Sequence, residues 1–303
     1  MSSRSEVVLK DAVVILTGAS RGIGPVIAQA LAERGAHLVL AARNATELQG
    51  VAERLASLNG GSGRVLCVPT DVAVPEQRSE LVARTLRELG RIDVLINNAG
   101  LEQIEFFEHL SEADTERFVT VNLTAPIQLT RLVLPSMLER GSGHIVNIAS
   151  VASFGAAAFG ETYGATKAGL LGFTRSLRAS LKTLDRSVSA SAVCPGFIES
   201  AGMFADAQAA HAVRAPAILG TCTPEAVAAS VVSAIENDEP ESIVTRRPMR
   251  LMLAVGLLFP RLLERLTLRL GVNAMFLQIA RAEQERRLSV VSGDERPAKA
   301  KAG

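Results

Sequence analysis

A tyrosine and a lysine stand four positions apart in the stretch ETYGATKAG, residues 161–169. Tyr163 is the one tyrosine of a 303-residue chain that has ten phenylalanines and no tryptophan, so packing does not require it. On a helix, residues four apart share a face. The ammonium group of Lys167 would then favour the phenolate form of Tyr163 and lower a pKa of about 10. The pair therefore suits general acid/base chemistry near neutral pH.

A glycine-rich turn lies near the start of the chain. Gly18 and Gly22 follow the apolar run AVVIL, and Gly24 begins the amphipathic stretch GPVIAQALAERG, in the spacing TGxxxGxG. Glycines allow positive φ and let the backbone approach a pyrophosphate at the positive N-terminus of a helix. An ordinary strand-to-helix turn would also use glycines. The spacing predicts a nucleotide phosphate site that includes Ser20 and Ile23.

Two arginines bear on which nucleotide would bind. Arg21 lies in the glycine loop, and Arg43 follows Ala42, at a point where NAD-specific proteins usually have an acid for the ribose hydroxyl. Guanidinium groups make bidentate contacts with phosphate oxygens, so the pair favours NADP(H) over NAD(H). Each arginine alone could be a solvated surface residue. Asp71, followed by Val72, could accept a hydrogen bond from the adenine amine or cap a turn.

The wider pattern alternates short apolar runs with longer amphipathic stretches from about residue 8 to 246. Apolar strands without polar alternation, separated by helical periods, are typical of a parallel sheet covered on both faces. We therefore expect an α/β fold, a Rossmann-type doubly wound parallel sheet, as a single domain over 8–246.

Taken together, the motifs resemble the short-chain dehydrogenase/reductase family. TGASRGIG (17–24), NNAG (97–100), Asn122, Ser150, Tyr163-x-x-x-Lys167 and Pro195-Gly196 occur in that family's order and spacing. The resemblance implies a catalytic set of Asn122, Ser150, Tyr163 and Lys167. Ser150 would orient the substrate oxygen, Asn122 would hold a water in a proton relay, and Lys167 would bind the nicotinamide ribose. Ser153 competes with Ser150, but the family's separation from the tyrosine favours Ser150.

The resemblance also implies the cofactor contacts. Asn98, with Ala99 and Gly100, would brace the sheet and border the cofactor, and Pro195, Gly196 and Ile198 would lie against the nicotinamide. Ser200 stands where the family often has a threonine that bonds the carboxamide. The full set is Gly18, Ser20, Arg21, Gly22, Ile23, Gly24, Arg43, Asp71, Val72, Asn98, Ala99, Gly100, Tyr163, Lys167, Pro195, Gly196, Ile198 and Ser200.

Composition excludes several other classes. The formal charge is +1 and no basic stripe is interleaved with aromatics, which argues against nucleic-acid binding. Three cysteines and four histidines are scattered, without the spacing of a metal site or a disulfide framework. There is no signal-peptide pattern and no apolar run of roughly 18 residues. We therefore expect a cytoplasmic protein without a metal.

The composition changes after residue 246. From Arg246 to Phe276 there are six arginines and one acid, Glu264, among many leucines. We expect a helical extension over 247–280 and a disordered tail over 281–303. The extension has two open interpretations: peripheral contact with an anionic membrane surface, or a packing element that closes the active site or joins subunits. The family's frequent dimers and tetramers imply a homo-oligomer.

The sequence thus predicts an NADP(H)-dependent oxidoreductase that interconverts a ketone or aldehyde and an alcohol. The segment over about 199–222, which covers the substrate in this family, is mostly apolar and offers Met203, Phe204 and Ile218, which favours a lipophilic substrate. A non-catalytic nucleotide sensor or scaffold on the same fold is the alternative, because fold alone does not fix function. A membrane-associated assembly protein is a third interpretation.

Overall fold

The computed structural model describes residues 7–58, 63–155, 157–211, 213–215, 220–246, 249–269 and 271–291. Its main sheet has seven strands, all parallel, in the order β3-β2-β1-β4-β5-β6-β9. The strands are β1 (Val13–Thr17), β2 (His37–Ala42), β3 (Val65–Pro69), β4 (Val94–Asn97), β5 (Gly143–Ile148), β6 (Val188–Pro195) and β9 (Glu241–Val244). The strand order reverses between β1 and β4, so a crevice opens there at the carboxyl edge of the sheet.

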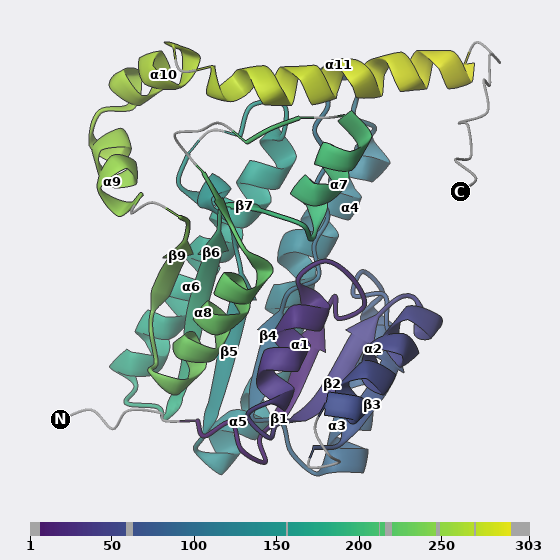
Figure 1. Ribbon diagram of the computed structural model, residues 1–303. Helices are drawn as coiled ribbons and strands as arrows, with labels where there is room; N and C mark the ends of the chain where they lie inside the picture. The colour runs from purple at the N-terminus through teal and green to yellow at the C-terminus, as the bar shows by residue number, and fades with distance from the viewer. Residues whose placement is uncertain are drawn as a thin grey trace.

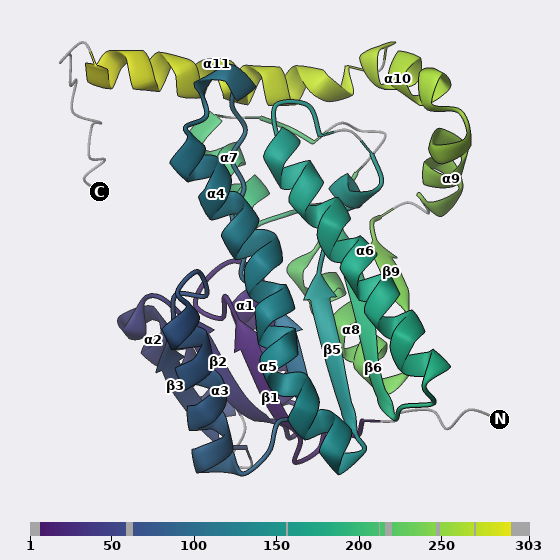
Figure 2. The same cartoon turned by 180° about the vertical axis from the view of Figure 1, so that it is seen from behind.

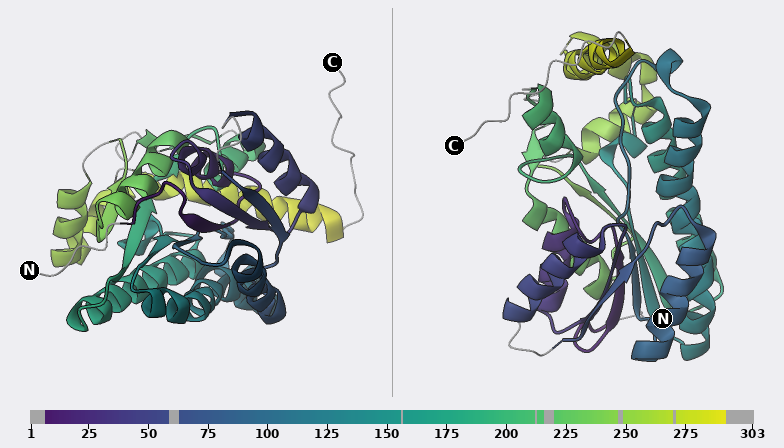
Figure 3. Two further views of the ribbon diagram at one scale, coloured as in Figure 1. Left: turned by 90° about the horizontal axis from the view of Figure 1, so that it is seen from below. Right: turned by 90° about the vertical axis from the view of Figure 1, so that its right-hand side faces the viewer.

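Helices cover both faces of this sheet (Figures 1, 2 and 3). One layer contains α1 (Gly24–Ala32), α2 (Ala45–Leu58) and α8 (Pro224–Glu236), with one apolar core beneath it. The other layer contains α3 (Pro75–Leu89), α5 (Ala125–Arg140) and α6 (Glu161–Thr183), over a second core. The predicted doubly wound α/β fold is therefore confirmed.

Several shorter elements lie around the carboxyl edge of the sheet. They are η1 (Phe107–His109), α4 (Glu112–Val119), the π-helical turn η2 (Thr120–Thr124), η3 (Val151–Ser153) and α7 (Met203–His211). A small parallel pair, β7 (Phe197–Ile198) and β8 (Thr221–Cys222), was not predicted. Its two-residue strands are too short to show a periodic pattern in the sequence.

The C-terminal extension forms α9 (Arg250–Leu258), α10 (Pro260–Arg269) and α11 (Val272–Val291). Figure 1 shows α11, in yellow, lying across the carboxyl side of the sheet above α7. Within the described residues, no helix is long and apolar enough to cross a membrane.

The tail expected to be disordered from residue 281 is helical as far as Val291. The expectation is wrong for 281–291, because α11 buries Met275 and Ile279 and its later turns form ion pairs with the body of the protein. Residues 292–303, like Ile218 of the expected substrate cover, lie outside the described residues.

Candidate active site

Tyr163 and Lys167 lie in the first two turns of α6. Both side chains are buried, and the Lys167 ammonium nitrogen is 5.7 Å from the centre of the Tyr163 ring. The same nitrogen donates a hydrogen bond of 2.8 Å to the Ile148 carbonyl at the end of β5. The lysine is therefore fixed between the tyrosine and the edge of the sheet, as the helical spacing predicted.

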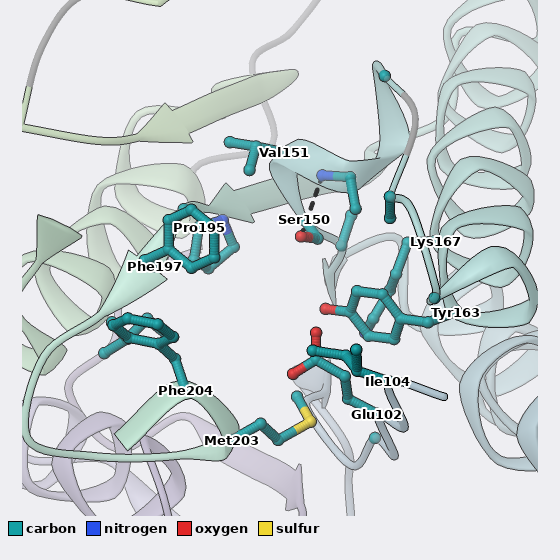
Figure 4. Close-up of a pocket in the computed structure, with 18 of the residues that line it drawn as sticks. Glu102, Ile104, Ser150, Val151, Tyr163, Lys167, Pro195, Phe197, Met203 and Phe204 are labelled. Carbon is teal, nitrogen blue, oxygen red and sulfur yellow. Dashed lines mark hydrogen bonds between the residues drawn. The ribbon is translucent and has the colours of Figure 1, made fainter. Parts of the chain in front are cut away.

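Ser150 follows β5 and points toward the same place. Figure 4 shows its hydroxyl across from the Tyr163 hydroxyl, and the two are close enough for a hydrogen bond that favours the phenolate. Ser150 Oγ also accepts a hydrogen bond of 3.1 Å from the Ala152 amide. The competing hydroxyl, that of Ser153, donates to the Lys167 carbonyl at 2.9 Å and serves the α6 backbone. The structure thus brings Ser150, rather than Ser153, to the tyrosine.

Asn122 lies in the π-helical turn η2, and its side chain is fully buried. Its Oδ1 accepts from the Leu101 amide and its Nδ2 donates to the Leu101 carbonyl, both at 2.8 Å. Nδ2 also reaches the Thr166 hydroxyl at 3.2 Å. The asparagine therefore ties the loop after β4 to α6, next to the lysine. A π-helical turn is often found at functional sites.

The glycine loop has the geometry expected of a phosphate cradle. Gly18 and Gly22 have φ of +64° and +62°, which disfavours any side chain. A Cβ on Gly18 would lie 2.8 Å from the Ala99 Cα, and one on Gly24 would lie 2.2 Å from the Gly18 carbonyl oxygen. Asn98 braces this turn, because its Nδ2 donates to the Gly18 carbonyl at 3.0 Å. The loop backbone therefore packs too closely against Ala99 and against itself for a larger residue at Gly18 or Gly24.

One cavity of about 1180 Å³ connects the glycine loop with the tyrosine. The predicted residues in its wall are Gly18, Arg21, Gly22, Ile23, Asn98, Ala99, Gly100, Ser150, Tyr163, Lys167, Pro195, Gly196 and Ile198. The predicted residues outside its wall are Ser20, Gly24, Arg43, Asp71, Val72, Asn122 and Ser200. Arg43 is exposed just after β2, and the Ser200 hydroxyl donates to the Glu199 carbonyl at 2.7 Å.

Asp71 is engaged in local structure. Its Oδ1 accepts from the Ala73 amide at 2.9 Å, and its Oδ2 lies 3.5 Å from an Arg117 nitrogen. This is the turn-capping interpretation of Asp71. The second carboxylate oxygen is paired with Arg117, and the contact with an adenine amine stays a prediction.

Burial dominates the electrostatics of the site. Burial raises the pKa of Tyr163 well above its usual range, and the carboxyl of Glu102 raises it further, while the Ser150 hydroxyl opposes both. Burial also lowers the pKa of Lys167 to about 8. The sequence predicted a lowered pKa for Tyr163, and the structure gives a raised one. The reason is that desolvation of the phenolate outweighs its favourable contacts.

Sequence reasoning missed Glu102 and Phe276 in the wall of the cavity, although it placed Phe204 in the substrate cover. Glu102, two residues after the NNAG motif, points into it beside Tyr163 (Figure 4). The three phenylalanines Phe197, Phe204 and Phe276 pack with ring centres 4.9 and 6.0 Å apart. Phe276 comes from α11, and its place in the cavity had no local sequence signal. The acid after NNAG was the available signal for Glu102.

Comparison with known proteins decides the family. The sequence profile of the family described as short chain dehydrogenase matches residues 12–212. The chain belongs to the short-chain dehydrogenase/reductase family. It is an oxidoreductase that acts on CH–OH groups with a nicotinamide dinucleotide. The chain is therefore an enzyme, and the alternative of a non-catalytic nucleotide sensor is wrong.

Three relatives of this short-chain dehydrogenase/reductase are informative. The ketoacyl reductase HetN of Nostoc sp. is 42% identical over 264 residues, covering 86% of this chain and 89% of that one. The D-beta-hydroxybutyrate dehydrogenase of Rhizobium meliloti is 34% identical over 185 residues, covering 61% and 70%. A crystal structure of a metagenomic short-chain oxidoreductase in complex with NADP has a TM-score of 0.65 at 30% identity, covering 78% and 98%.

Proposed function

We propose that this enzyme interconverts a lipophilic ketone or aldehyde and its alcohol with NADP(H), using Tyr163 as the general acid/base. The observation that carries the proposal is the shared cavity. The glycine loop forms one end of this cavity. The Tyr163 and Ser150 hydroxyls lie at the other end, with Lys167 beside them. A carbonyl group held at those hydroxyls would lie within the same enclosed space as a dinucleotide on the loop.

The residues present fit such a dinucleotide. Gly18 and Gly24 allow the tight turn that begins α1, at whose N-terminus a pyrophosphate would lie, and the Lys167 ammonium group lies next to Gly100 near the expected ribose. When bound, the cofactor supplies hydride chemistry, which no side chain has.

Side chains of the enzyme donate the proton and position the substrate oxygen that receives it. In the reductive direction Tyr163 Oη holds the proton that the substrate oxygen receives. The Ser150 hydroxyl donates a hydrogen bond to the same oxygen and so fixes its position. The Lys167 charge lies beside the ring and stabilises the phenolate that remains. The tyrosine then regains a proton through a relay that passes Lys167 and the buried Asn122.

The preference for NADP(H) rests on Arg21 and Arg43. Both guanidinium groups are exposed, one in the glycine loop and one after β2, where parallel neighbouring strands bring their carboxyl ends together. Their charge would attract a 2′-phosphate, and the loop after β2 has Ala42 in place of an acid. Kinetics with NADPH and NADH side by side test this; a preference for NADH would overturn it.

The substrate class follows from the cavity wall and from a relative. Away from the tyrosine the wall is largely apolar, with Phe197, Phe204, Phe276 and Met203. HetN is named a ketoacyl reductase, so a β-ketoacyl ester or thioester is the first substrate to try. A decrease in NADPH absorbance with such esters supports the function. No turnover across a panel of ketones, aldehydes and ketoacyl esters would contradict it.

The extension has a part in this function. Met249, Leu253 and Phe276 line the cavity, which supports the interpretation that 247–280 helps to close the active site. The apolar side chains exposed on α9, α10 and the link between them also support peripheral contact with a membrane: Leu251, Val255, Leu258, Phe259, Leu262 and Leu268. Co-flotation of the full chain with anionic, but not neutral, vesicles would support that contact. Light scattering would test the homo-oligomer expected from the family.

A further inference from the structure

Glu102 is an acid in the catalytic half of the cavity that the proposed mechanism does not use. It follows the NNAG loop after β4, and the backbone just before it is held rigidly. Asn122 bonds both the amide and the carbonyl of Leu101 at 2.8 Å. Figure 4 shows the Glu102 carboxyl group directed into the cavity toward the Tyr163 hydroxyl. The fold therefore places this carboxyl group beside the reacting oxygen.

The residues around the Glu102 carboxyl group offer few polar contacts in place of the water that it loses. Ile104, Met203 and Phe204 form the neighbouring wall. Within the described part of the chain, no residue forms a hydrogen bond or an ion pair with it. The charge of Lys167 acts on it, and that ammonium group already donates to the Ile148 carbonyl. Burying part of a carboxyl group without a hydrogen-bond partner costs free energy, so the position of Glu102 points to a functional role.

The cavity wall has three further charged groups from other elements. Arg21 belongs to the glycine loop, Asp206 to α7 and Glu264 to α10. Tyr163 and Lys167 face Glu102 from α6. Asp206 and Glu264 are acids, so the cavity wall has three carboxyl groups, one lysine and one arginine.

We propose that Glu102 is a specificity-determining residue that excludes substrates with a carboxylate two carbons from the reacting carbonyl. The site then takes neutral carbonyl compounds, such as β-keto esters and thioesters, and rejects the free β-keto acids. This inference rests on the proposed function and narrows its substrate class. A carboxylate two carbons from the reacting carbonyl would lie a few ångströms from the Glu102 carboxylate. Like charges repel strongly when water is excluded.

The repulsion depends on the ionisation of Glu102. Burial raises the pKa of this carboxyl group to about 7, and the charge of Lys167 opposes the rise. Glu102 is therefore charged above about pH 7 and neutral below it. A β-keto acid stays ionised throughout, because carboxyl pKa values lie near 4. Discrimination against the acid should be strong at pH 8.5 and weak at pH 6.

The test compares ethyl acetoacetate with acetoacetate as substrates of the wild type, E102Q and D206N, with NADPH at both pH values. The measured quantity is the ratio of kcat/KM for the ester to that for the acid. The ratio is compared between E102Q and the wild type at the same pH, because Tyr163 and Lys167 are present in both proteins. We expect E102Q to lower this ratio about tenfold at pH 8.5 and to change it little at pH 6. D206N, which removes an acid elsewhere in the same wall, should leave the ratio near that of the wild type.

A ratio that E102Q leaves unchanged at pH 8.5 would overturn the inference, while turnover of the ester would still support the function. Absence of turnover with both substrates would instead send the proposed function to the wider panel of ketones, aldehydes and ketoacyl esters. In that case the unreactive pair pentanoate and pentanamide tests the charge effect alone, by calorimetry on the NADPH complex. E102Q should strengthen pentanoate binding at pH 8.5 and leave pentanamide binding unchanged. Equal binding of pentanoate to both proteins would again overturn the inference.

Discussion

Arg287 of α11 should anchor the C-terminal helix over the substrate end of the cavity. Its Nη2 lies 2.7 Å from the Glu105 carboxylate, which is 1% exposed, and its Nη1 donates to the His109 carbonyl at 2.8 Å. Gln103 also donates to this carboxylate, but the other Glu105 oxygen is buried without a partner among the described residues. Replacing Arg287 with methionine keeps the aliphatic bulk and leaves the buried carboxylate without its cation.

The size of the effect follows from burial. Removing one partner of a fully buried ion pair costs about 3–5 kcal/mol, and an exposed pair is worth about 0–1 kcal/mol. The Arg287 side chain is 39% exposed, so about 2–3 kcal/mol is expected. Because α11 can undock without unfolding the sheet, the loss should appear in helix docking. It corresponds to about a 30- to 140-fold shift in that equilibrium.

Hydrogen exchange along α11 and substrate KM measure this docking. In R287M, amide protection in α11 should fall by about the expected factor and KM should rise, with kcat at saturation changed little. R286M is the matched control, because Arg286 pairs with Glu283 on the same helix and its side chain is 70% exposed. The double variant R287M/E105Q should recover protection, since no charge is left buried. Equal losses in R286M and R287M would refute the reasoning.

Three further predictions concern the cofactor site and stability. Gly18→Ala should abolish NADPH binding, measured by fluorescence titration, because of the positive φ and the 2.8 Å approach to Ala99; unchanged affinity would contradict the cradle. Arg43→Ala should raise KM for NADPH about tenfold and KM for NADH less than threefold, and equal changes would contradict a 2′-phosphate contact. Partial burial opposes ionisation of Asp238, but hydrogen bonds from Arg178 and Lys182 lower its pKa to about 2. Since this pKa is depressed on folding, the stabilisation is present at neutral pH and is lost as pH falls from about 4 toward 2. Asp238→Asn should lower the free energy of unfolding by about 2–3 kcal/mol at pH 7 in urea titrations, and a difference that persists undiminished near pH 2 would contradict this.

Local patterns in the sequence predicted most of the fold. Apolar runs such as AVVIL and HLVLAA, alternating with helical periods, suffice for a parallel sheet because such strands are buried on both faces. The four-residue spacing of Tyr163 and Lys167 likewise predicted their shared helix face. These features depend on neighbours in the chain, which is why they could be found without a structure.

Features that join distant segments could not be found in this way. Arg287 pairs with Glu105 across 182 positions, and no periodicity marks either residue. The path of α11 across the cavity depends on the same contacts, so the sequence left the role of the extension open. The raised pKa of Tyr163 was missed for a related reason, because desolvation depends on how completely the fold encloses the ring.

The central claim is that Tyr163 supplies the proton for carbonyl reduction. Tyr163→Phe removes only the hydroxyl, and the rest of the cavity keeps its shape. NADPH oxidation should therefore fall by a factor of about 10² or more in a stopped-flow assay with the best ketoacyl ester, with the dissociation constant for NADPH unchanged. Turnover within a few-fold of the wild type, with NADPH still bound, would contradict the account.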